Sequence, residues 1–586
     1  MYDQLRRARK RQMIIFLLVV VTLGGLLGRL YYWQIAQAHS GYNLAQLASQ
    51  EHLQNQILNA PRGIIYDATG HILATNVIRD DVYIEPIQFS VDHPDSPQNA
   101  LVSLILTLHR VLPQVSENTL TQDFALNQQA VLVATRIDPA QSQQLQSLQL
   151  PDVFLEPRTW RVYPAGSLAA QILGFVSSST NQGVYGIESQ YNALLAGKPG
   201  SFTAETDLNG NPLIVGASSE QAPVPGANIS LTIDSAIQYM VQNDLDNAVK
   251  QLGAQGGSVT VINARTGAIV AMAGNPTFDP NQYGNYSGQT GCLGTEEVYF
   301  NPSLYCAYEP GSVMKAVTMA AALDQGLITP NTTFYDPGYI QFNDAPIVYN
   351  WNYQGYGMET MTQVLLHSAN VGAAWVAHNI LGAQRFYPYV AAFHLGQAYN
   401  IDGAEESGNY RTPSNSPQVW SPSDLTRQAF GQSIQVTPLQ MAMVYQTIAN
   451  GGLMMRPYIV ASIDNNGQVT TTQPQVERRV ISAKAARELS GMLVSAAFDG
   501  APQSTIVPGY TVASKTGTAT TQGISNTQTE ASMAGFLPAS SPQFVILVKL
   551  DRPAGSIFGI TAAGPLWQTV AQQLMWYYHV PPDAGT

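Results

Sequence analysis

The sequence of 586 residues contains little charge, two cysteines and seven lysines. Charged side chains make up 11% of the chain, against roughly 25% in an average globular protein. Two cysteines are too few for a disulfide scaffold or a cysteine-rich zinc module, and the nine histidines include no HExxH motif. The sequence therefore predicts no metal site, and we expect no cofactor.

Positive charge is scarce beyond the N-terminus. The net charge is −12, and the first eleven residues carry a net +4, so the remainder sums to −16. An acidic body without a long basic stretch argues against nucleic-acid binding. The 29 Tyr, 17 Phe and 7 Trp supply core material, which favours a folded chain over a disordered one. The length predicts three or four domains of ~150 residues each.

One long hydrophobic run lies near the N-terminus. Residues 13–28 carry no charge, and a bilayer span needs roughly 20 residues. We expect a transmembrane helix over residues 12–36, with Arg29 at the outer interface beside Tyr31, Tyr32 and Trp33. Cations before the span predict a cytoplasmic tail at residues 1–11 and an exported body, in a single-pass plasma-membrane protein. The alternative is a cleaved signal peptide.

The two cysteines, Cys292 and Cys306, lie in the exported part of the chain. Oxidising compartments permit disulfides, so the pair is either bonded or remains as two free or buried thiols. The two residues lie 14 apart in a stretch rich in Gly and Tyr, and the oxidising context slightly favours a bond.

The chain divides at a stretch rich in Gly, Pro, Asn and Ser over residues 196–226. Before it, we expect a helix leaving the membrane at 37–60, a strand–turn–strand unit at 62–76 and helical structure at 95–150. After it, we expect a strand at 229–233, a helix from Asp234 or Ser235 to Leu252 and a hairpin at 258–273. Helices are predicted near 312–325, 360–380, 437–450 and 565–578, and strands near 510–517, 531–537 and 543–551. Strands around a helical middle indicate one sheet with helices on both sides.

Of the seven lysines, Lys315 alone has a serine three residues before it, in Ser312-Val-Met-Lys315. Positions three apart on a helix share a face, so the amine can reach the hydroxyl. A serine at a helix N-terminus also lies in a field that favours developing negative charge. The alternative is a helix-capping serine with an unrelated lysine.

A second lysine lies in Lys515-Thr516-Gly517-Thr518, on a segment that resembles a strand. Such a strand places a cation and two hydroxyls along one edge, which suits a substrate carboxylate. Gly517 allows a ligand backbone to approach closely. Taken alone, the same residues could instead form a turn without a functional role.

A third motif, Ser368-Ala-Asn370, lies between the other two. The pattern Ser-x-Asn also occurs at Ser116, Ser179 and Ser407. Only the order of the three motifs along the chain selects Ser368.

In this order the motifs resemble those of the penicillin-recognising serine transpeptidases and β-lactamases. Further segments are similar to class B penicillin-binding proteins in particular. These segments are Arg62–Asp67, Arg161–Pro164, Tyr185–Glu188, Leu231–Asp234, Tyr308–Ser312, Gly431–Gln432, Thr437–Gln440, Ala449–Gly452 and Ala534–Phe536. The resemblance spans nearly the whole chain. It implies an α/β (α+β) protein with an N-terminal transmembrane helix, an elongated α+β pedestal over residues 37–225, and a transpeptidase domain over residues 226–586 with a mainly antiparallel sheet flanked by helices.

The resemblance also implies catalytic roles. Ser312 attacks the carbonyl of a D-Ala-D-Ala peptide bond, and Lys315 takes its proton if burial beside another cation depresses its pKa. Ser368 relays a proton to the leaving D-Ala, Asn370 orients the lysine and the substrate amide, and Lys515 supplies positive field.

The substrate-binding residues follow from the same resemblance. The hydroxyls of Thr516 and Thr518 hold the terminal carboxylate beside Gly517, and the backbone N–H groups of Ser312 and Thr518 form an oxyanion hole. The implied substrates are peptidoglycan stem peptides, and β-lactams would leave a long-lived ester on Ser312. The implied partner is a glycan polymerase of the shape, elongation, division and sporulation (SEDS) family, within a division or elongation complex.

Other functions remain open. A D,D-carboxypeptidase would share the chemistry with water as acceptor, and a division scaffold would keep the fold without activity. A class A β-lactamase needs a deacylating glutamate, for which residues 371–514 offer no matching motif. In the pedestal, we expect Arg62, Arg161 and Glu188 to form buried ion pairs or turn contacts.

Overall fold

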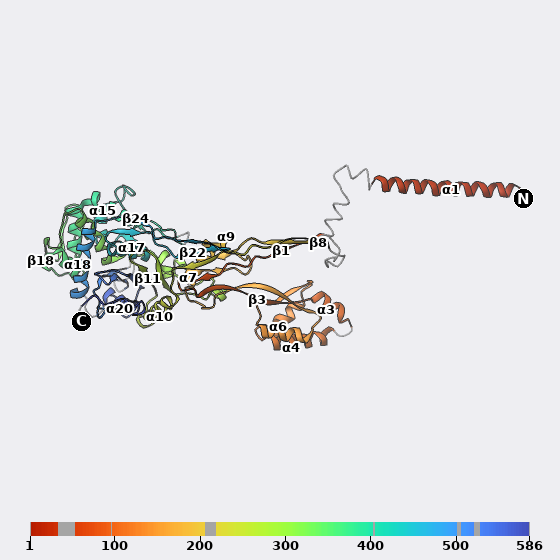
Figure 1. The fold of residues 1–586 in the computed structure, drawn as a ribbon, viewed down its shortest axis with the longest axis horizontal. Coiled ribbons are helices and arrows are strands. Elements are labelled where there is room, and N and C mark those ends of the chain that lie inside the picture. The colour runs from red at the N-terminus through yellow and green to blue at the C-terminus, as the bar shows by residue number, and fades with distance from the viewer. Residues whose placement is uncertain are drawn as a thin grey trace. The chain divides into compact units, whose positions relative to one another are not determined.

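The computed structural model describes residues 2–32, 53–94, 97–205, 218–401, 405–500, 506–520 and 528–584. These residues form two compact units (Figure 1). The smaller unit comprises Met1–Pro61 and Gly197–Gly226, and the larger unit comprises Arg62–Ala196 and Ala227–Thr586.

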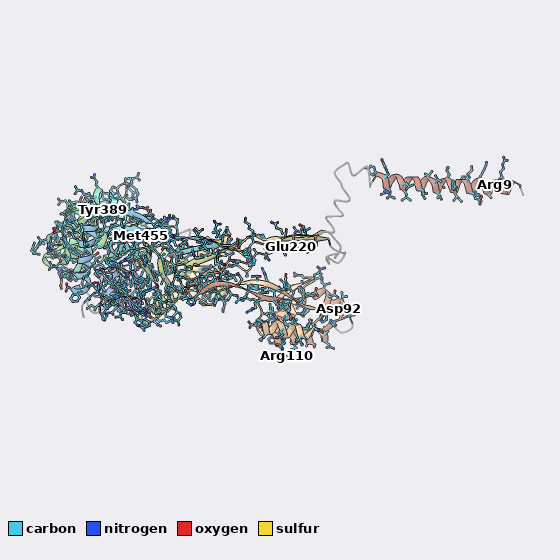
Figure 2. All side chains as sticks on the ribbon, in the orientation of Figure 1. Arg9, Asp92, Arg110, Glu220, Tyr389 and Met455 are labelled. Carbon is cyan, nitrogen blue, oxygen red and sulfur yellow. A yellow bond between two sulfur atoms is a disulfide. The ribbon has the colours of Figure 1, made fainter. Side chains whose placement is uncertain are left out.

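The smaller unit contains α1 (Tyr2–Tyr31) and a three-stranded sheet. Within α1, Arg6–Tyr31 is long and apolar enough to cross a membrane. Arg9 lies on the N-terminal part of this helix (Figure 2). The helix therefore begins within the expected tail, and residues 33–36 of the expected span lie outside the described residues.

The sheet of the smaller unit joins β1 (Leu53–Leu58), β8 (Gly200–Glu205) and β9 (Ser218–Gln221) in that order. The prediction of a helix over residues 37–60 is therefore wrong for residues 53–58, which form β1. Residues 37–52 lie outside the described residues. β1 pairs along its whole length with β8, from Leu53 opposite Glu205 to Leu58 opposite Gly200. This ladder overrides the local helix propensity of a Gln- and Leu-rich segment.

The first part of the larger unit is built on a twisted sheet of order β23-β22-β10-β2-β3-β4, with β5 also paired to β3. The strands are β2 (Ile65–Tyr66), β3 (Ile72–Ile84), β4 (Val131–Ala134), β5 (Val153–Val162), β10 (Asn228–Leu231), β22 (Val460–Asn465) and β23 (Gln468–Thr471). Its helices are α3 (Pro86–Asp92), α4 (Pro97–Val111), α5 (Glu117–Phe124), α6 (Pro139–Leu148), α7 (Ala170–Leu173), α8 (Gly186–Gln190) and α9 (Asn192–Leu195), with the short strands β6 (Phe175–Val176) and β7 (Gly183–Val184). The expected strand–turn–strand unit is present as β2 and β3, whereas the region expected to be helical at 95–150 also contains β4.

Two arginines and one glutamate form a buried ion-pair cluster in this part. Nε of Arg62 donates to Oε2 of Glu188 at 2.7 Å, and Nε of Arg161 donates to Oε1 at 2.7 Å. Glu188 is fully buried, and the hydroxyl of Tyr163 also donates to Oε1. The expectation of buried ion pairs is confirmed for these three residues.

Replacing Glu188 with Gln is expected to lower the free energy of unfolding of the larger unit by about 3–5 kcal/mol. The reason is that the change leaves two buried guanidinium groups without their counterion. The measurement is urea denaturation of the full chain in detergent. The matched control is Glu477→Gln, because Glu477 forms an exposed pair with Arg478 at 3.3 Å. Glu477→Gln is expected to lower the free energy of unfolding by less than about 1 kcal/mol. Equal decreases in the two variants would contradict the prediction.

The second part of the larger unit contains a five-stranded antiparallel sheet of order β12-β11-β27-β26-β25. The strands are β11 (Gly256–Asn263), β12 (Ile269–Asn275), β25 (Ala513–Thr520), β26 (Thr529–Leu537) and β27 (Phe544–Asp551). Alternate residues of β27 enter different cores: Val545 and Leu547 pack on the side of α17 (Pro438–Ala449), and Ile546 and Val548 pack on the side of α10 (Ser235–Leu252) and α20 (Gly559–Tyr577). Figure 1 shows β11 between these two layers. The expected sheet with helices on both sides is confirmed.

The remaining elements surround the α17 face of the sheet. The helices are η5 (Gly311–Met314), α12 (Lys315–Asp324), α13 (Met361–Leu366), α14 (Asn370–Trp375), η6 (Val376–Leu381), α15 (Gly382–Ala392), α16 (Pro422–Gln428) and α18 (Ala483–Gly500). Short strand pairs are β15 (Thr333–Asp336) with β18 (Gly357–Thr360), β16 (Tyr339–Ile340) with β17 (Val348–Tyr349), β19 (Asn409–Tyr410) with β20 (Ile434–Gln435), and β21 (Leu453–Met455) with β24 (Val476–Arg479). The helix α18 was not expected from the sequence, and the single helix expected at 360–380 is interrupted between α13 and α14.

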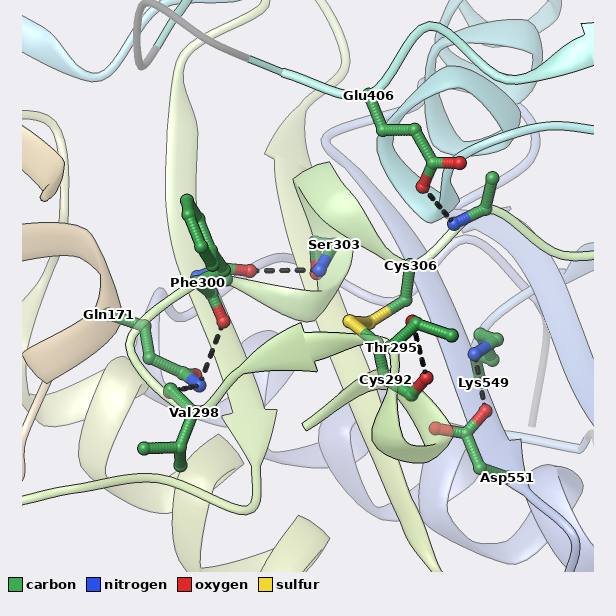
Figure 3. The surroundings of a disulfide bond; sticks show 12 residues. Gln171, Cys292, Thr295, Val298, Phe300, Ser303, Cys306, Glu406, Lys549 and Asp551 are labelled. Atoms are coloured by element: carbon green, nitrogen blue, oxygen red, sulfur yellow. Dashed lines mark hydrogen bonds and ion pairs between the residues drawn. A yellow bond between two sulfur atoms is a disulfide. The ribbon is translucent and has the colours of Figure 1, made fainter. Parts of the chain in front are cut away.

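Of the two alternatives for the cysteines, the structure contains the disulfide, between Cys292 and Cys306 (Figure 3). The bond closes a segment containing η4 (Cys292–Gly294), β14 (Glu296–Glu297) and α11 (Pro302–Tyr305). The segment is preceded by η3 (Pro280–Tyr286) and by β13 (Thr290–Gly291), which pairs with β14. Just after it, the carboxylate of Glu406 accepts a hydrogen bond from the backbone N–H of Ala307 at 2.7 Å. The disulfide and this contact fix the chain that leads to η5.

Candidate active site

The first two motif residues meet at the start of a buried helix. The turn Glu309-Pro-Gly311 leads into η5, and Ser312 and Lys315 lie on one face, as the spacing predicts. Nζ of Lys315 donates to Oγ of Ser312 at 2.9 Å. Lys315 is fully buried in the core helix α12, so its amine is held away from bulk water.

The second motif lies at the break between α13 and α14. Ser368 adopts a φ of 55°, and its Oγ donates to Oγ of Ser312 at 2.8 Å. Nζ of Lys315 contacts the carbonyl oxygen of Ser368 at 2.6 Å and Oδ1 of Asn370 at 2.8 Å. A left-handed backbone conformation costs free energy at a residue other than glycine. At Ser368 this conformation turns the carbonyl oxygen and the hydroxyl oxygen toward Lys315. This break in the expected helix therefore brings Ser368 and Asn370 to Lys315.

The third motif lies on β25, the last strand of its sheet. Lys515 is 5% exposed, and Nζ donates to the carbonyl of Thr516 at 3.2 Å. Oγ1 of Thr518 accepts the N–H of Gly559 at 2.9 Å, which leaves its own proton available to a ligand. The second edge of β25 forms no ladder with another described strand, so an extended peptide can pair with it.

Four glycines allow these elements to touch, and we call them the glycine stack: Gly431, Gly311, Gly517 and Gly559. A Cβ on Gly431 would overlap the backbone of Gly311, and a Cβ on Gly311 would press on the backbone of Thr518. A Cβ on Gly517 would meet the carbonyl of Pro310, and one on Gly559 would overlap the carbonyl of Gly517. The turn that carries Ser312, which we call the nucleophile turn after the role the resemblance implies, therefore packs backbone against backbone with β25 and the start of α20.

The electrostatics of the site favour a neutral lysine beside the serine. Burial lowers the pKa of Lys315 well below its usual value, the charge of Lys515 lowers it further, and Glu359 opposes both. Burial also lowers the pKa of Lys515 to about 8. A neutral Lys315 has a lone pair that can accept the hydroxyl proton of Ser312.

A cavity of about 700 Å³ opens over these residues. Its lining includes Ser312, Ser368, Asn370, Lys515, Thr516 and Thr518. Arg427 adds a second cation, and no carboxylate lies among the described lining residues. The cavity therefore suits a ligand that carries a carboxylate. Gly517 lies on β25 between lining residues without lining the cavity itself.

One wall of the cavity was not predicted from the sequence. It is formed by Tyr349, Trp351, Tyr353, His367 and Phe558. Three of these aromatic residues belong to the tyrosine-rich stretch at 349–356, whose composition was the only signal available. Aromatic residues without a spacing motif do not reveal from the sequence alone whether they belong to a core or a binding site.

Two family models match the chain. The penicillin-binding protein transpeptidase domain matches residues 257–575, and the penicillin-binding protein dimerisation domain matches residues 57–231. Among curated relatives, the penicillin-binding protein PbpB of Mycolicibacterium smegmatis is 33% identical over 84% of this chain and 76% of its own. The peptidoglycan D,D-transpeptidase FtsI of Escherichia coli is 28% identical over 97% of this chain and 92% of its own.

Solved structures show the same similarity. A peptidoglycan synthetase from Bifidobacterium adolescentis has a TM-score of 0.70 and 26% identity, covering 91% of this chain and 98% of its own. Penicillin-binding protein 3 from Mycobacterium tuberculosis, complexed with aztreonam, has a TM-score of 0.67 and 26% identity, covering 90% and 98%.

Proposed function

Because the chain belongs to the family of penicillin-binding protein transpeptidases, we propose that it cross-links peptidoglycan through an acyl-enzyme on Ser312. The family is that of the peptidoglycan D,D-transpeptidases, which are serine-type acyltransferases. One observation carries the mechanism: the amine of Lys315 lies 2.9 Å from Oγ of Ser312 and also contacts Ser368 and Asn370.

In the first half-reaction Oγ of Ser312 attacks the carbonyl of the D-Ala-D-Ala bond while neutral Lys315 takes its proton. Ser368, which contacts both groups, passes a proton to the nitrogen of the leaving D-Ala. Asn370 holds the lysine in place through Oδ1 and offers its amide to the donor peptide. The products are an ester on Ser312 and free D-Ala.

The donor peptide binds along β25. Its terminal carboxylate is held by the charge of Lys515 and by the hydroxyls of Thr516 and Thr518, while Gly517 lets the strand pack against the nucleophile turn. The backbone N–H groups of Ser312 and Thr518 stabilise the oxyanion, and one such donor is typically worth ~10²–10³ in rate. A β-lactam, which also carries a carboxylate beside a reactive carbonyl, acylates Ser312 in the same pose.

The domain assignment is part of the proposal. Residues 1–11 form a cytoplasmic tail, residues 12–36 cross the plasma membrane, residues 37–225 form the pedestal and residues 226–586 form the transpeptidase domain. The apolar helix α1 and the two family matches support this division. A SEDS-type glycan polymerase, in a division or elongation complex, supplies the glycan strands that the enzyme cross-links.

The test is product analysis with the full chain in detergent, using a donor peptide that ends in D-Ala-D-Ala and an amine acceptor. A cross-linked product with release of D-Ala supports a transpeptidase. Hydrolysis alone supports a D,D-carboxypeptidase, rapid turnover of penicillin supports a β-lactamase, and no reaction with or without the polymerase supports a scaffold. Each of the last three outcomes contradicts the proposal.

A further inference from the structure

A buried carboxylate and a histidine form a pair beside the catalytic motifs. Nδ1 of His367 lies 2.9 Å from Oε2 of Glu359, and the carboxylate is 1% exposed. His367 immediately precedes Ser368 and lines the active-site cavity. The mechanism of the first half-reaction uses neither member of the pair.

The imidazole ring is held in one orientation. The ring of Tyr356 stacks on it with centroids 4.3 Å apart and planes 13° apart. The carbonyl of His367 accepts the indole N–H of Trp351 at 3.3 Å. Nδ1 of the ring faces Glu359. The other ring nitrogen, Nε2, makes no hydrogen bond within the part of the chain that the structure describes. A carboxylate that accepts from Nδ1–H fixes the tautomer in which Nε2 is a base.

The second half-reaction needs a base of its own. At neutral pH the acceptor arrives as an ammonium ion, because a primary amine such as a lysine side chain has a pKa of ~10.4. Forming an amide from an ammonium nitrogen releases two protons. One returns to Oγ of Ser312 as the ester bond breaks, along the same Lys315 and Ser368 relay. The other proton needs a different acceptor, because Lys315 and Ser368 are already occupied in returning the first proton to Ser312.

We propose that His367, oriented by Glu359, accepts this second proton from the acceptor ammonium. The inference rests on the proposed function and assigns a residue to its second half. Nε2 takes a proton from the ammonium group, and the resulting free amine attacks the ester carbonyl on Ser312. The bond from carbon to nitrogen forms, the bond from carbon to Oγ breaks, and Oγ recovers its proton from the nitrogen through Lys315. The imidazolium then releases its proton to solvent through the cavity.

The surrounding charges suit a transient imidazolium. Glu359 on β18 supplies the counterion, and burial raises its pKa while the hydrogen bond from His367 opposes the rise. Asp336 on β15 adds a second negative group close to Glu359. The lysines nearby are Lys315 on α12, which interacts with Glu359 and whose pKa is lowered by burial, and Lys515 on β25. The pair therefore places a carboxylate against Nδ1 of the ring, where it can stabilise the positive charge of the imidazolium.

The test uses the full chain carrying His367→Asn, because the Asn amide can still donate to Glu359 while the base at Nε2 is lost. An ester donor ending in D-Ala-D-lactate forms the acyl-enzyme, and the ratio of aminolysis to hydrolysis is measured by mass spectrometry. Attack by water needs only the one proton return to Ser312, so hydrolysis is an internal reference. The ratio is expected to fall about 10²-fold with a lysine-type ε-amine acceptor.

The acceptor's own basicity separates a base from a structural residue. An α-amine acceptor, with a pKa of ~8, already carries free amine near neutral pH, so its ratio is expected to fall less than that of the ε-amine. Raising the pH toward the pKa of the ε-amine is expected to restore the ratio of aminolysis to hydrolysis that the His367→Asn chain shows with this acceptor. An unchanged ratio, or a loss equal for both amines at every pH, would overturn the proposal.

Two further variants complete the experiment. His378→Asn is the matched control, because His378 pairs with Asp344 at 2.8 Å outside the cavity lining, and its ratio should equal the wild-type value. Glu359→Gln keeps an acceptor for Nδ1–H but removes the charge, and a drop of about tenfold is expected. If the His367→Asn chain is not acylated, the Glu359→Gln ratio decides the proposal alone. A failure of the wild type to acylate at all would instead reject the proposed function.

Discussion

The Ser312→Ala chain is expected to form no covalent adduct with a β-lactam, whereas the wild type gains one β-lactam mass per chain. The reason is that acylation needs the hydroxyl that lies 2.9 Å from Lys315 and 2.8 Å from Ser368. The measurements are intact-mass spectrometry and fluorescent-penicillin labelling of the full chain in detergent.

The control for this prediction is Ser287→Ala, because Ser287 is exposed and lies outside the cavity lining. It should be labelled as the wild type is. The alanine at position 312 removes one oxygen and leaves Lys315 its contacts with Ser368 and Asn370, so the fold should survive. An adduct on another serine of the Ser312→Ala chain would refute the choice of nucleophile.

Replacing Lys315 with Met is expected to slow acylation by about 10²–10⁴-fold, the usual contribution of a positioned general base. Methionine preserves the length and apolar stem of the buried side chain, so the decrease in acylation rate measures the contribution of the amine. The measurement is the second-order rate of acylation by a chromogenic cephalosporin. Lys250→Met is the control, since Lys250 is an exposed residue at the end of α10. A rate within tenfold of the wild type would exclude Lys315 as the base.

The same prediction has a pH dependence with a definite sign. The acylation rate of the wild type should rise as Lys315 loses its proton and level off well below pH 10.5, because burial and Lys515 lower its pKa. It should fall again near pH 8, where Lys515 loses the charge that attracts the substrate carboxylate. The Lys315→Met chain should lack the rising limb and keep the falling one.

The parts of the fold that local chemistry determines could be predicted from the sequence. Asp234 caps α10, which spans Ser235–Leu252 as expected, because a side-chain oxygen at that position accepts the first N–H groups of the helix. The order of the three motifs selected Ser312, Ser368 and Lys515, and the structure brings them around one cavity.

Other features depend on contacts distant in sequence. β1 becomes a strand because β8, far along the chain, completes its ladder. The left-handed turn at Ser368 brings both of its oxygens to Lys315, a contact distant in sequence that no dipeptide preference reports. The helix α18 is a different case, because its buried residues Ala485, Leu489, Met492 and Ala496 recur at helical spacing. This helical spacing can be read from the sequence alone.

The glycine stack limits how this protein could become resistant to an inhibitor. Any side chain at Gly311, Gly431, Gly517 or Gly559 would force backbone apart where the nucleophile turn meets β25. Substitution of any one of these four glycines is therefore expected to disturb the packing of Ser312 against β25 and to cost the protein its proposed activity. Resistant variants should instead carry substitutions in the side chains of the cavity wall, such as Tyr349, Trp351 and Phe558, where bulk can change without moving the backbone.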